Sequence, residues 1–259
     1  MTHTMKDVLG QAIADHYYQS SRSKLWVHSR WDPRPDGRIP TIRELKENMP
    51  VKTYFREADD LPELEWIALQ HCAGSILDIG AGAGSHALLL QQMGQKVTAL
   101  DISPLAAKVM KQRGVRNVLC KDFFKLASSS GSATKRESSG TGPRYDTLLL
   151  LMNGIGLAGT LAGLHIFLQK ARTLLNPGGS LIFDSCDIAY LYQHRPPSKA
   201  PYYGEVFYQY EYRRVRTDWF NWLFIDRRTL RRIATKEGWK VTFLFEDRSD
   251  QYLVNLAMA

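Results

Sequence analysis

The segment Asp78-Ile-Gly-Ala-Gly-Ala-Gly84 is the feature that most constrains the fold, because it follows a short apolar run and precedes a helical pattern. The run is Ser75–Ile79, and Ser85 is a good N-cap for a helix that Gly94 would end. Glycines lack a Cβ and let the backbone approach a ligand closely, while a helix N-terminus adds N–H donors and a positive dipole end. Alone, this segment is typical of a dinucleotide site, of a methyl-donor site or of a simple tight turn.

Short apolar runs alternate with amphipathic helical segments after this point. The expected strands are residues 75–79, 96–100, 115–120, 145–152 and 180–183, followed by an antiparallel pair at 240–245 and 251–257. Between the second and third strands, Ser103 is a good N-cap, Pro104 a good first helical residue and Gly114 a good stop. This alternation predicts βαβ units and a doubly wound, mostly parallel sheet with helices on both faces.

Residues 1–70 and two insertions lie outside the alternation. Residues 1–70 are aromatic-rich, and we expect them to form a helical lid and substrate segment. Residues 128–144 are rich in Ser, Gly and Thr and predict a flexible surface loop. Residues 187–225 alternate polar and apolar side chains and predict an extra hairpin with its turn at Thr217-Asp218. We therefore expect two domains, at 1–70 and 71–259, the second carrying both insertions.

Composition and charge exclude several classes of protein. No stretch approaches the roughly 18–20 apolar residues of a membrane span, and the N-terminus lacks the apolar core of a secretion signal. The three cysteines form no CxxC pair, so we expect a cytoplasmic protein without a disulfide framework or a metal site. Nine of the basic residues lie between Arg213 and Lys240, beside three acidic ones. We expect these basic residues to lie on a solvated helix face, and a nucleic-acid partner is the weaker alternative.

Further polar side chains are expected at the C-terminal ends of strands, where open α/β sheets bind ligands. Asp101 ends the second strand, and a carboxylate there can accept both hydroxyls of a ribose. Lys121-Asp122-Phe123 ends the third strand, where an adenine could receive a hydrogen bond and an apolar cover. The turn Asn176-Pro-Gly-Gly179 precedes the fifth strand.

Together these features resemble a known family. The segment ILDIGAGAG, Asp101 in ALDIS, Asp122 and LLNPGG are similar to the class I S-adenosylmethionine-dependent methyltransferases, over roughly residues 75–257. The run MNGIGLAGTLAGL, with DSCDIAY and YYGE, is similar to a bacterial group of the small-molecule type. The resemblance implies a Rossmann-like α/β fold with a seven-stranded sheet, an antiparallel last strand, and S-adenosylmethionine as the methyl donor.

The resemblance also implies donor contacts at the first two strands. Gly80, Ala81 and Gly82 would pack against the methionine part of the donor. Asp101 would hold the ribose, and Ile102 would flank the adenine.

Five more residues are candidates for the donor site. Asp122 and Phe123 would contact the adenine amine and ring, and Asn153 would face the donor or the acceptor. Asp78 would either orient the loop by accepting backbone N–H bonds or touch the ligand. Arg56, in the lid, could pair with the donor's carboxylate.

A nicotinamide dinucleotide is the alternative cofactor. A GxGxxG fingerprint would need glycine where Ser85 stands, and Gly84 comes one residue early. The spacing therefore favours the methyl donor without excluding the dinucleotide.

The sequence constrains the identity of the methyl acceptor less than that of the methyl donor. Asn153-Gly-Ile-Gly156 replaces the Asn/Asp-Pro-Pro-Tyr/Phe that is typical of enzymes methylating base amines, which argues against that subclass. The aromatic residues of 1–70 and 187–225 predict a pocket for a flat or apolar small molecule, although they would also suit the core or a homodimer interface. The alternatives are an RNA or protein methyltransferase that uses the basic C-terminal face, and a non-catalytic S-adenosylmethionine-binding protein.

No general base is identified by its neighbours. The candidates are His194, Glu205, Tyr203 and Asp184, and His86 is expected near the donor or on a plain helix surface. A base is needed only where the acceptor must lose a proton near the transition state.

Overall fold

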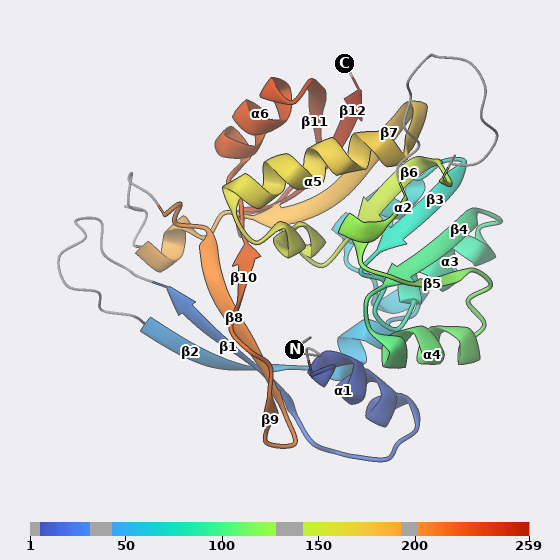
Figure 1. Cartoon of the computed structure of the whole chain (residues 1–259), viewed down its shortest axis with the longest axis vertical. Coiled ribbons are helices and arrows are strands. Elements are labelled where there is room, and N and C mark those ends of the chain that lie inside the picture. Colours follow the sequence, from blue (N-terminus) through green and yellow to red (C-terminus); the bar gives the residue numbers. More distant parts are fainter. Residues whose placement is uncertain (1–5, 32–42, 128–141, 193–200, 259) are drawn as a thin grey trace.

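The central feature of the computed structural model is a seven-stranded sheet (Figure 1). The structure describes residues 6–31, 43–127, 142–192 and 201–258. The strand order is β11-β12-β7-β6-β3-β4-β5. Their bounds are β3 Ser75–Ile79, β4 Lys96–Asp101, β5 Val118–Cys120, β6 Tyr145–Leu150, β7 Leu175–Cys186, β11 Trp239–Glu246 and β12 Gln251–Met258. The last strand, β12, is antiparallel to both of its neighbours, and the pairs from β7 to β5 are parallel. The predicted Rossmann-like sheet with an antiparallel last strand is confirmed.

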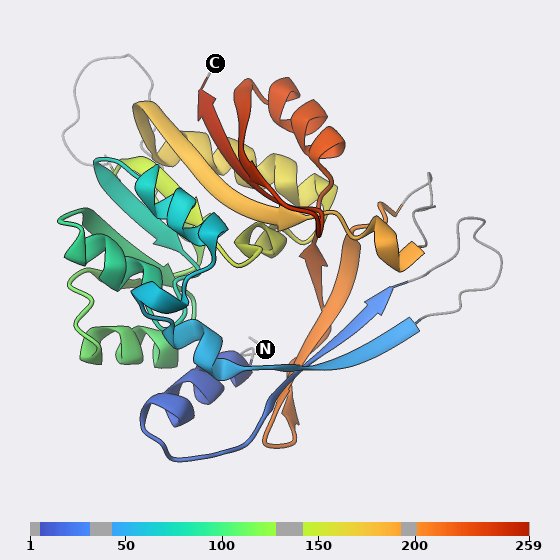
Figure 2. The same ribbon diagram turned by 180° about the vertical axis from the view of Figure 1, so that it is seen from behind.

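Helices cover both faces of this sheet. Their bounds are α2 Glu63–Gln70, α3 Ser85–Gln92, α4 Pro104–Gln112, α5 Leu161–Leu174 and α6 Arg227–Lys236. The apolar side chains of α5 and α6 share one core with one face of the strands, and those of α2, α3 and α4 share another core with the opposite face. The view from behind shows α2 and α3 in front of the sheet (Figure 2). The carboxyl ends of the parallel strands are where open α/β sheets bind ligands.

A second, antiparallel sheet joins the two segments that the sequence assigns to the substrate. It runs β10-β8-β1-β2, and β9 pairs with β8. The bounds are β1 Leu25–Trp31, β2 Arg43–Met49, β8 Glu205–Tyr212, β9 Val215–Arg216 and β10 Phe220–Leu223. Helix α1 (Val8–Tyr17) contacts both β8 and α4, so it connects this sheet to the main one.

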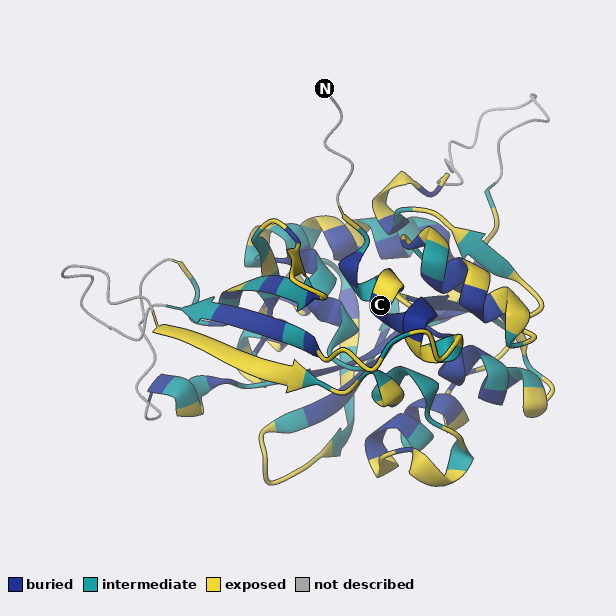
Figure 3. Ribbon diagram, turned by 90° about the horizontal axis from the view of Figure 1, so that it is seen from below, coloured by how far each residue is buried: buried dark blue, intermediate teal, exposed yellow. Residues whose placement is uncertain are grey.

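The prediction of a helical segment over residues 1–70 is therefore wrong in its middle part. Helices form at α1 and α2, whereas β1 and β2 are strands. Leu25 and Val27 are buried on one face of β1 and pair in register with Tyr212 and Tyr210 of β8. Strand β2 is exposed along nearly its whole length (Figure 3) and consists largely of good helix formers. Pairing with β1 overrides that local preference.

The predicted hairpin of residues 187–225 forms, but its turn lies elsewhere. Arg213 and Arg214 have φ values of +49° and +65°, and they connect β8 to β9. Two central residues with positive φ are typical of the type I′ turn that suits the twist of a hairpin. Thr217, expected in the turn, instead bonds to Tyr210 of β8, with its N–H donating to the carbonyl and its Oγ1 accepting from the N–H, both at 3.0 Å.

Residues 128–141 of the predicted surface loop 128–144 lie outside the described residues. In the part of the chain that the structure describes, we find no helix with the length and apolar character that a membrane crossing requires.

Candidate active site

The glycine-rich loop is held against the carboxyl end of β4. The N–H groups of Gly80 and Ala81 donate to the carbonyl of Leu100 at 2.8 and 3.0 Å, and Gly82 donates to Asp101 Oδ2 at 2.9 Å. Gly80 and Gly82 have φ values of +74° and +56°, a region that glycine adopts without steric cost. A Cβ at Gly80 would meet no atom within 4 Å, so the space beside this residue is open to a ligand.

Asp101 holds the loop in place and keeps further capacity to accept hydrogen bonds. Its Oδ1 accepts from the N–H of Ser103 at 2.8 Å, while Oδ2 accepts from Gly82. Burial raises the pKa of Asp101, although these two hydrogen bonds act in the opposite direction. Each carboxylate oxygen can accept a second hydrogen bond. The geometry therefore leaves room for the predicted ribose contact, which stays a prediction.

The 3₁₀ helix η1 (Val51–Phe55) covers part of the glycine loop. The Tyr54 ring lies so close to Gly82 that a Cβ there would be 2.9 Å from it. The Tyr54 carbonyl accepts from Ser85 Oγ at 2.9 Å, which ties η1 to the start of α3. Nothing in the local sequence around Tyr54 indicates this contact.

A buried ion pair links α2 to α3 beside the loop. His86 Nε2 lies 2.8 Å from Glu65 Oε2, and Arg56 Nη1 donates to Glu65 Oε1. Burial lowers the pKa of His86, but the hydrogen bond to Glu65 and the charges of Asp78, Glu65 and Asp184 raise it overall. Arg56, predicted to meet the donor's carboxylate, is thus bound to Glu65. No local sequence pattern indicates this role of Glu65, because its partner is 21 positions away.

Asp78 is buried beneath the loop with an unsatisfied oxygen. Its side chain is 2% exposed, and Oδ2 has no hydrogen-bond partner among the described residues. Burial raises the pKa of Asp78 to about 6, against the lowering effect of His86. The loop N–H groups are bound by Leu100 and Asp101. Of the two predicted roles for Asp78, contact with a ligand therefore fits this geometry better than orienting the loop.

The residues expected at the adenine differ in accessibility. Ile102 is 57% exposed and free to flank a ligand. Asp122 Oδ1 accepts from the N–H of Phe124 at 2.9 Å and caps a short 3₁₀ helix, Phe123–Lys125. Phe123 is buried, and its ring stacks on Phe167 with 4.6 Å between centroids. The structure thus places the Phe123 ring in the core, contrary to the expected adenine cover.

A cavity of about 800 Å³ opens at the carboxyl ends of β6 and β7. Met152 and Asn153, which line it, have left-handed φ values of +61° and +54°. Two such residues in succession are strained, and strain of this kind is often found at functional sites. The strain is held by Asp184, since both of its oxygens accept from the Asn153 N–H at 3.0 Å, and by Ser185 Oγ, which donates to Asn153 Oδ1 at 2.9 Å.

None of the glycine-loop residues 80–84 lines this cavity, but one of its walls is connected to the helix that follows the loop. Arg56 and Glu65 line the cavity, and Glu65 bonds to His86 at the start of α3. The aromatic side chains of the lining are Tyr190 and Phe224.

The candidate bases lie in different environments. His194 lies outside the described residues. Glu205 Oε1 accepts from the N–H of Leu161 at 2.8 Å and so caps the first turn of α5. Tyr203 Oη donates to Asp187 Oδ1 at 2.6 Å. Neither Glu205 nor Tyr203 lines the cavity, whereas Asp184 does.

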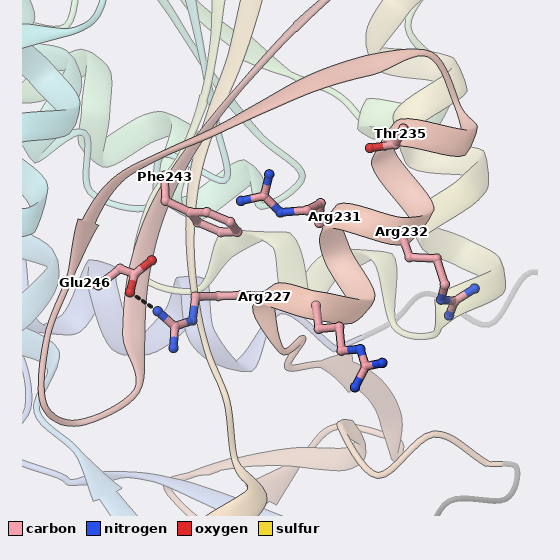
Figure 4. Close-up of a pocket in the computed structure, with 7 residues that line it drawn as sticks. Arg227, Arg231, Arg232, Thr235, Phe243 and Glu246 are labelled. Carbon is pink, nitrogen blue, oxygen red and sulfur yellow. Dashed lines mark ion pairs between the residues drawn. The ribbon is translucent and has the colours of Figure 1, made fainter.

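A second hollow of about 660 Å³ lies between α6 and β11 and contains the basic face (Figure 4). Arg227 pairs with Glu246, and Arg231 lies over the Phe243 ring at 5.1 Å. The apolar stripe of α6 is buried as predicted, with the arginines on the other side of the helix. Strand β11 is the fourth strand from β3, which places this hollow on the order of 19 Å from the strand that carries the glycine loop.

Known proteins resemble this chain in sequence and in fold. Residues 51–243 match the family model described as a methyltransferase domain. A crystal structure from Bacteroides fragilis, described as a SAM-dependent methyltransferase in complex with S-adenosyl-L-homocysteine, is 36% identical with a TM-score of 0.79, covering 98% of this chain and 95% of that one. A search of curated proteins gives no match.

More distant structures share the fold alone. The glycopeptide N-methyltransferase MtfA is 18% identical with a TM-score of 0.51, over 76% of this chain and 93% of that one. The CcbJ methyltransferase from Streptomyces caelestis is 14% identical with a TM-score of 0.52, over 80% of this chain and 98% of that one. With the family match over most of its length and the Bacteroides relative over nearly all of it, the chain belongs to the SAM-dependent methyltransferases.

Proposed function

We propose that this enzyme transfers a methyl group from S-adenosylmethionine to a small molecule bound in the cavity of about 800 Å³. The observation that carries the proposal is that a cavity-lining residue, Glu65, bonds to His86 in the helix that follows the glycine loop. The volume lies within the roughly 300–1,000 Å³ of small-molecule sites. The Bacteroides relative, described as a complex with S-adenosyl-L-homocysteine, supports the same donor here and argues against a dinucleotide.

The described residues around the loop fit the donor. The open space at Gly80 suits the methionine part, and the unpaired oxygen of Asp78 suits an ammonium group. Asp101 would hold the ribose with its remaining acceptor positions, and exposed Ile102 would flank the adenine. When bound, the donor supplies a methyl group on a sulfonium. Arg56 would meet the donor's carboxylate only by sharing its contact with Glu65.

The second sheet packs behind Phe224, the aromatic residue that follows β10 and lines the cavity. Tyr208 and Trp222 stack with 6.0 Å between centroids, and Tyr208 also contacts Phe224, which lines the cavity. A Cβ at Gly156 would collide with the Trp222 ring, so the second sheet is packed directly on the loop after β6. Methyl transfer depends chiefly on holding the acceptor in line with the methyl group, and such a rigid wall contributes to that placement.

An RNA or protein acceptor would use the basic hollow of α6 and β11. That hollow shares no lining residue with the cavity at the carboxyl ends of β6 and β7, which favours the small-molecule acceptor. The three free thiols of Cys72, Cys120 and Cys186 support a reducing, cytoplasmic location as part of the proposal. A homodimer remains a prediction, which light scattering on the purified protein would test.

Turnover on fractionated material tests the proposal. The enzyme is incubated with methyl-labelled S-adenosylmethionine and with separate fractions of small metabolites, RNA and protein. Label in the small-metabolite fraction is the expected result. Label in RNA or protein would contradict the small-molecule acceptor, and donor binding without label in any fraction would favour the non-catalytic alternative.

A further inference from the structure

We propose that the acceptor is an amine that enters the cavity as an ammonium ion and gives its proton to Asp184 before methyl transfer. This inference rests on the proposed function and names the substrate class of the same site. Its basis is a buried carboxylate that faces the cavity and forms no ion pair with any of the described residues.

Asp184 lies near the carboxyl end of β7 and is 1% exposed. Its hydrogen-bond donors are the backbone N–H of Asn153, at 3.0 Å to each oxygen, and Gln251 Nε2, at 3.3 Å to Oδ2. Gln251 reaches it because β12 pairs with β7, with Gln251 opposite Cys186. These donors are neutral amides. A buried carboxylate that lacks a counter-charge is costly, and an arriving ammonium ion would relieve that cost.

The cationic side chains near Asp184 have other partners or lie at the edge of the cavity. Arg56 and His86 are both bound to Glu65, whose negative charge adds to the local potential around Asp184. Arg248 and Asp250 line the cavity from the exposed turn between β11 and β12, and their formal charges cancel. Within the inner part of the cavity, Asp184 and Glu65 are negative and Arg56 is positive, and Glu65 is the carboxylate that Arg56 binds. Asp184 is therefore the carboxylate that an arriving cation can meet, which favours a cationic acceptor over a carboxylate or a phosphate.

The rest of the lining suits the body of such an amine. Phe224 and Tyr190 offer aromatic surface beside Asp184, and the stacked Tyr208 and Trp222 extend the aromatic surface behind Phe224. Aromatic faces attract ammonium groups and also bury apolar substituents. The matching acceptor is a primary or secondary amine that carries an apolar or aromatic group.

The proton and electron balance is simple. The ammonium N–H bond breaks, the proton goes to an Asp184 oxygen, and the nitrogen keeps the electron pair. That pair forms the new N–C bond to the methyl group as the C–S bond breaks, and its electrons leave with the sulfur as a neutral thioether. The product leaves as a methylated ammonium ion, and Asp184 returns its proton to water. Burial raises the pKa of Asp184 to about 6, which is close to the value that suits proton transfer near neutral pH.

Binding of matched amines and alcohols to the enzyme saturated with S-adenosylhomocysteine tests the proposal. The probes are 2-phenylethylamine, tyramine and cyclohexylamine, each compared with the alcohol of the same skeleton, by calorimetry at pH 7.5 and pH 5. At pH 7.5 at least one amine is expected to bind at least tenfold more tightly than its alcohol. At pH 5 the preference should be lost, because Asp184 is then protonated while Glu65, whose pKa is lowered overall by His86 and Arg56 despite its burial, stays charged.

Two variants test whether Asp184 causes the preference for amines over alcohols. Asp184→Asn should abolish the preference for amines, whereas Asp59→Asn should keep it, because Asp59 is exposed and does not line the cavity. Binding of S-adenosylhomocysteine shows that each variant is folded, and the pH arm on the wild type needs no variant. Equal binding of amines and alcohols, failure of every amine to bind, or a preference that survives Asp184→Asn would overturn the proposal. If S-adenosylhomocysteine itself did not bind to the wild type, the proposed function would fail instead.

Discussion

Replacing Asp78 by asparagine is expected to stabilise the ligand-free protein and to weaken its affinity for the donor. Burial raises the pKa of this carboxyl from its ordinary value near 4 to about 6. One pKa unit corresponds to about 1.4 kcal/mol, so ionisation of Asp78 costs the folded state about 3 kcal/mol at neutral pH. Asparagine has nearly the same shape without the charge. Part of the gain is lost because His86 loses an anionic neighbour, which leaves an expected gain of about 1–3 kcal/mol.

Urea unfolding of the ligand-free protein at pH 4 and pH 7.5 measures this effect. A carboxyl pKa that is higher in the folded state means that the native protein binds more protons than the unfolded chain between about pH 4 and pH 6. The contributions of Asp78 and of Asp184, whose pKa is also about 6, should therefore fall as the pH rises through this window, whereas carboxyls with a lowered pKa, such as Asp146 and Asp226, act in the opposite direction. Asp78→Asn should remove the fall that Asp78 contributes, so the variant gains stability relative to wild type as the pH rises. At pH 4 the two proteins should be nearly equal in stability.

The same variant should bind S-adenosylhomocysteine at least tenfold more weakly at pH 7.5, because the donor's ammonium group loses the partner that we propose for it. Stability and affinity would thus change in opposite directions. An Asp78→Asn protein that is less stable than wild type at pH 7.5, or that binds S-adenosylhomocysteine equally well, would refute the reasoning.

Three further substitutions test other contacts. Asp101→Ala leaves two backbone N–H groups without an acceptor and should cost about 2–4 kcal/mol in urea unfolding, with at least a tenfold loss of S-adenosylhomocysteine affinity; unchanged affinity would reject the ribose contact. Gly156→Ala should cost about 1–3 kcal/mol and alter tryptophan fluorescence, because the new Cβ displaces the Trp222 ring, and an unperturbed spectrum would contradict this packing. Glu65→Gln should cost about 3 kcal/mol at pH 6. Because the pKa of His86 is raised, the Glu65–His86 ion pair stabilises the folded state fully below about pH 6.5, and this stabilisation is lost as the pH rises through the His86 pKa. Equal pH profiles of unfolding for the variant and the wild type would contradict this contribution of the ion pair.

The main sheet could be predicted because its signals are local. The glycine loop, the N-cap at Ser103 and the alternation of apolar runs depend on neighbouring residues, and the loop and the N-cap appear where they were expected. The strand bounds are less exact, because β5 begins at Val118 and β7 begins at Leu175, so the predicted turn at residues 176–179 lies within β7. The second sheet could not be predicted in full, because β2 pairs with β1 against its own helical preference. The hairpin turn at Arg213 and Arg214 contains neither of the residues, glycine or asparagine, that usually mark such turns.

Site residues are likewise easier to predict where the signal is local. Asp78, Asp101 and Asn153 could be proposed from the sequence because each stands at or near the carboxyl end of a strand, and their roles at the donor stay predictions. Glu65 could not be found, since its role depends on how α2 packs beside α3. Phe123 and Phe124 are adjacent, and no sequence pattern tells which ring is buried.

Ligand-induced thermal stabilisation tests the central claim most directly. S-adenosylhomocysteine, S-adenosylmethionine, NADH and NADPH are compared in parallel with the purified protein. A ligand at about 100 times its dissociation constant adds about 2.7 kcal/mol, or about 5–10 °C in a domain of this size. Stabilisation by the two adenosyl ligands alone is the predicted result. Stabilisation by a nicotinamide cofactor alone would contradict the assignment of the glycine loop to a methyl donor.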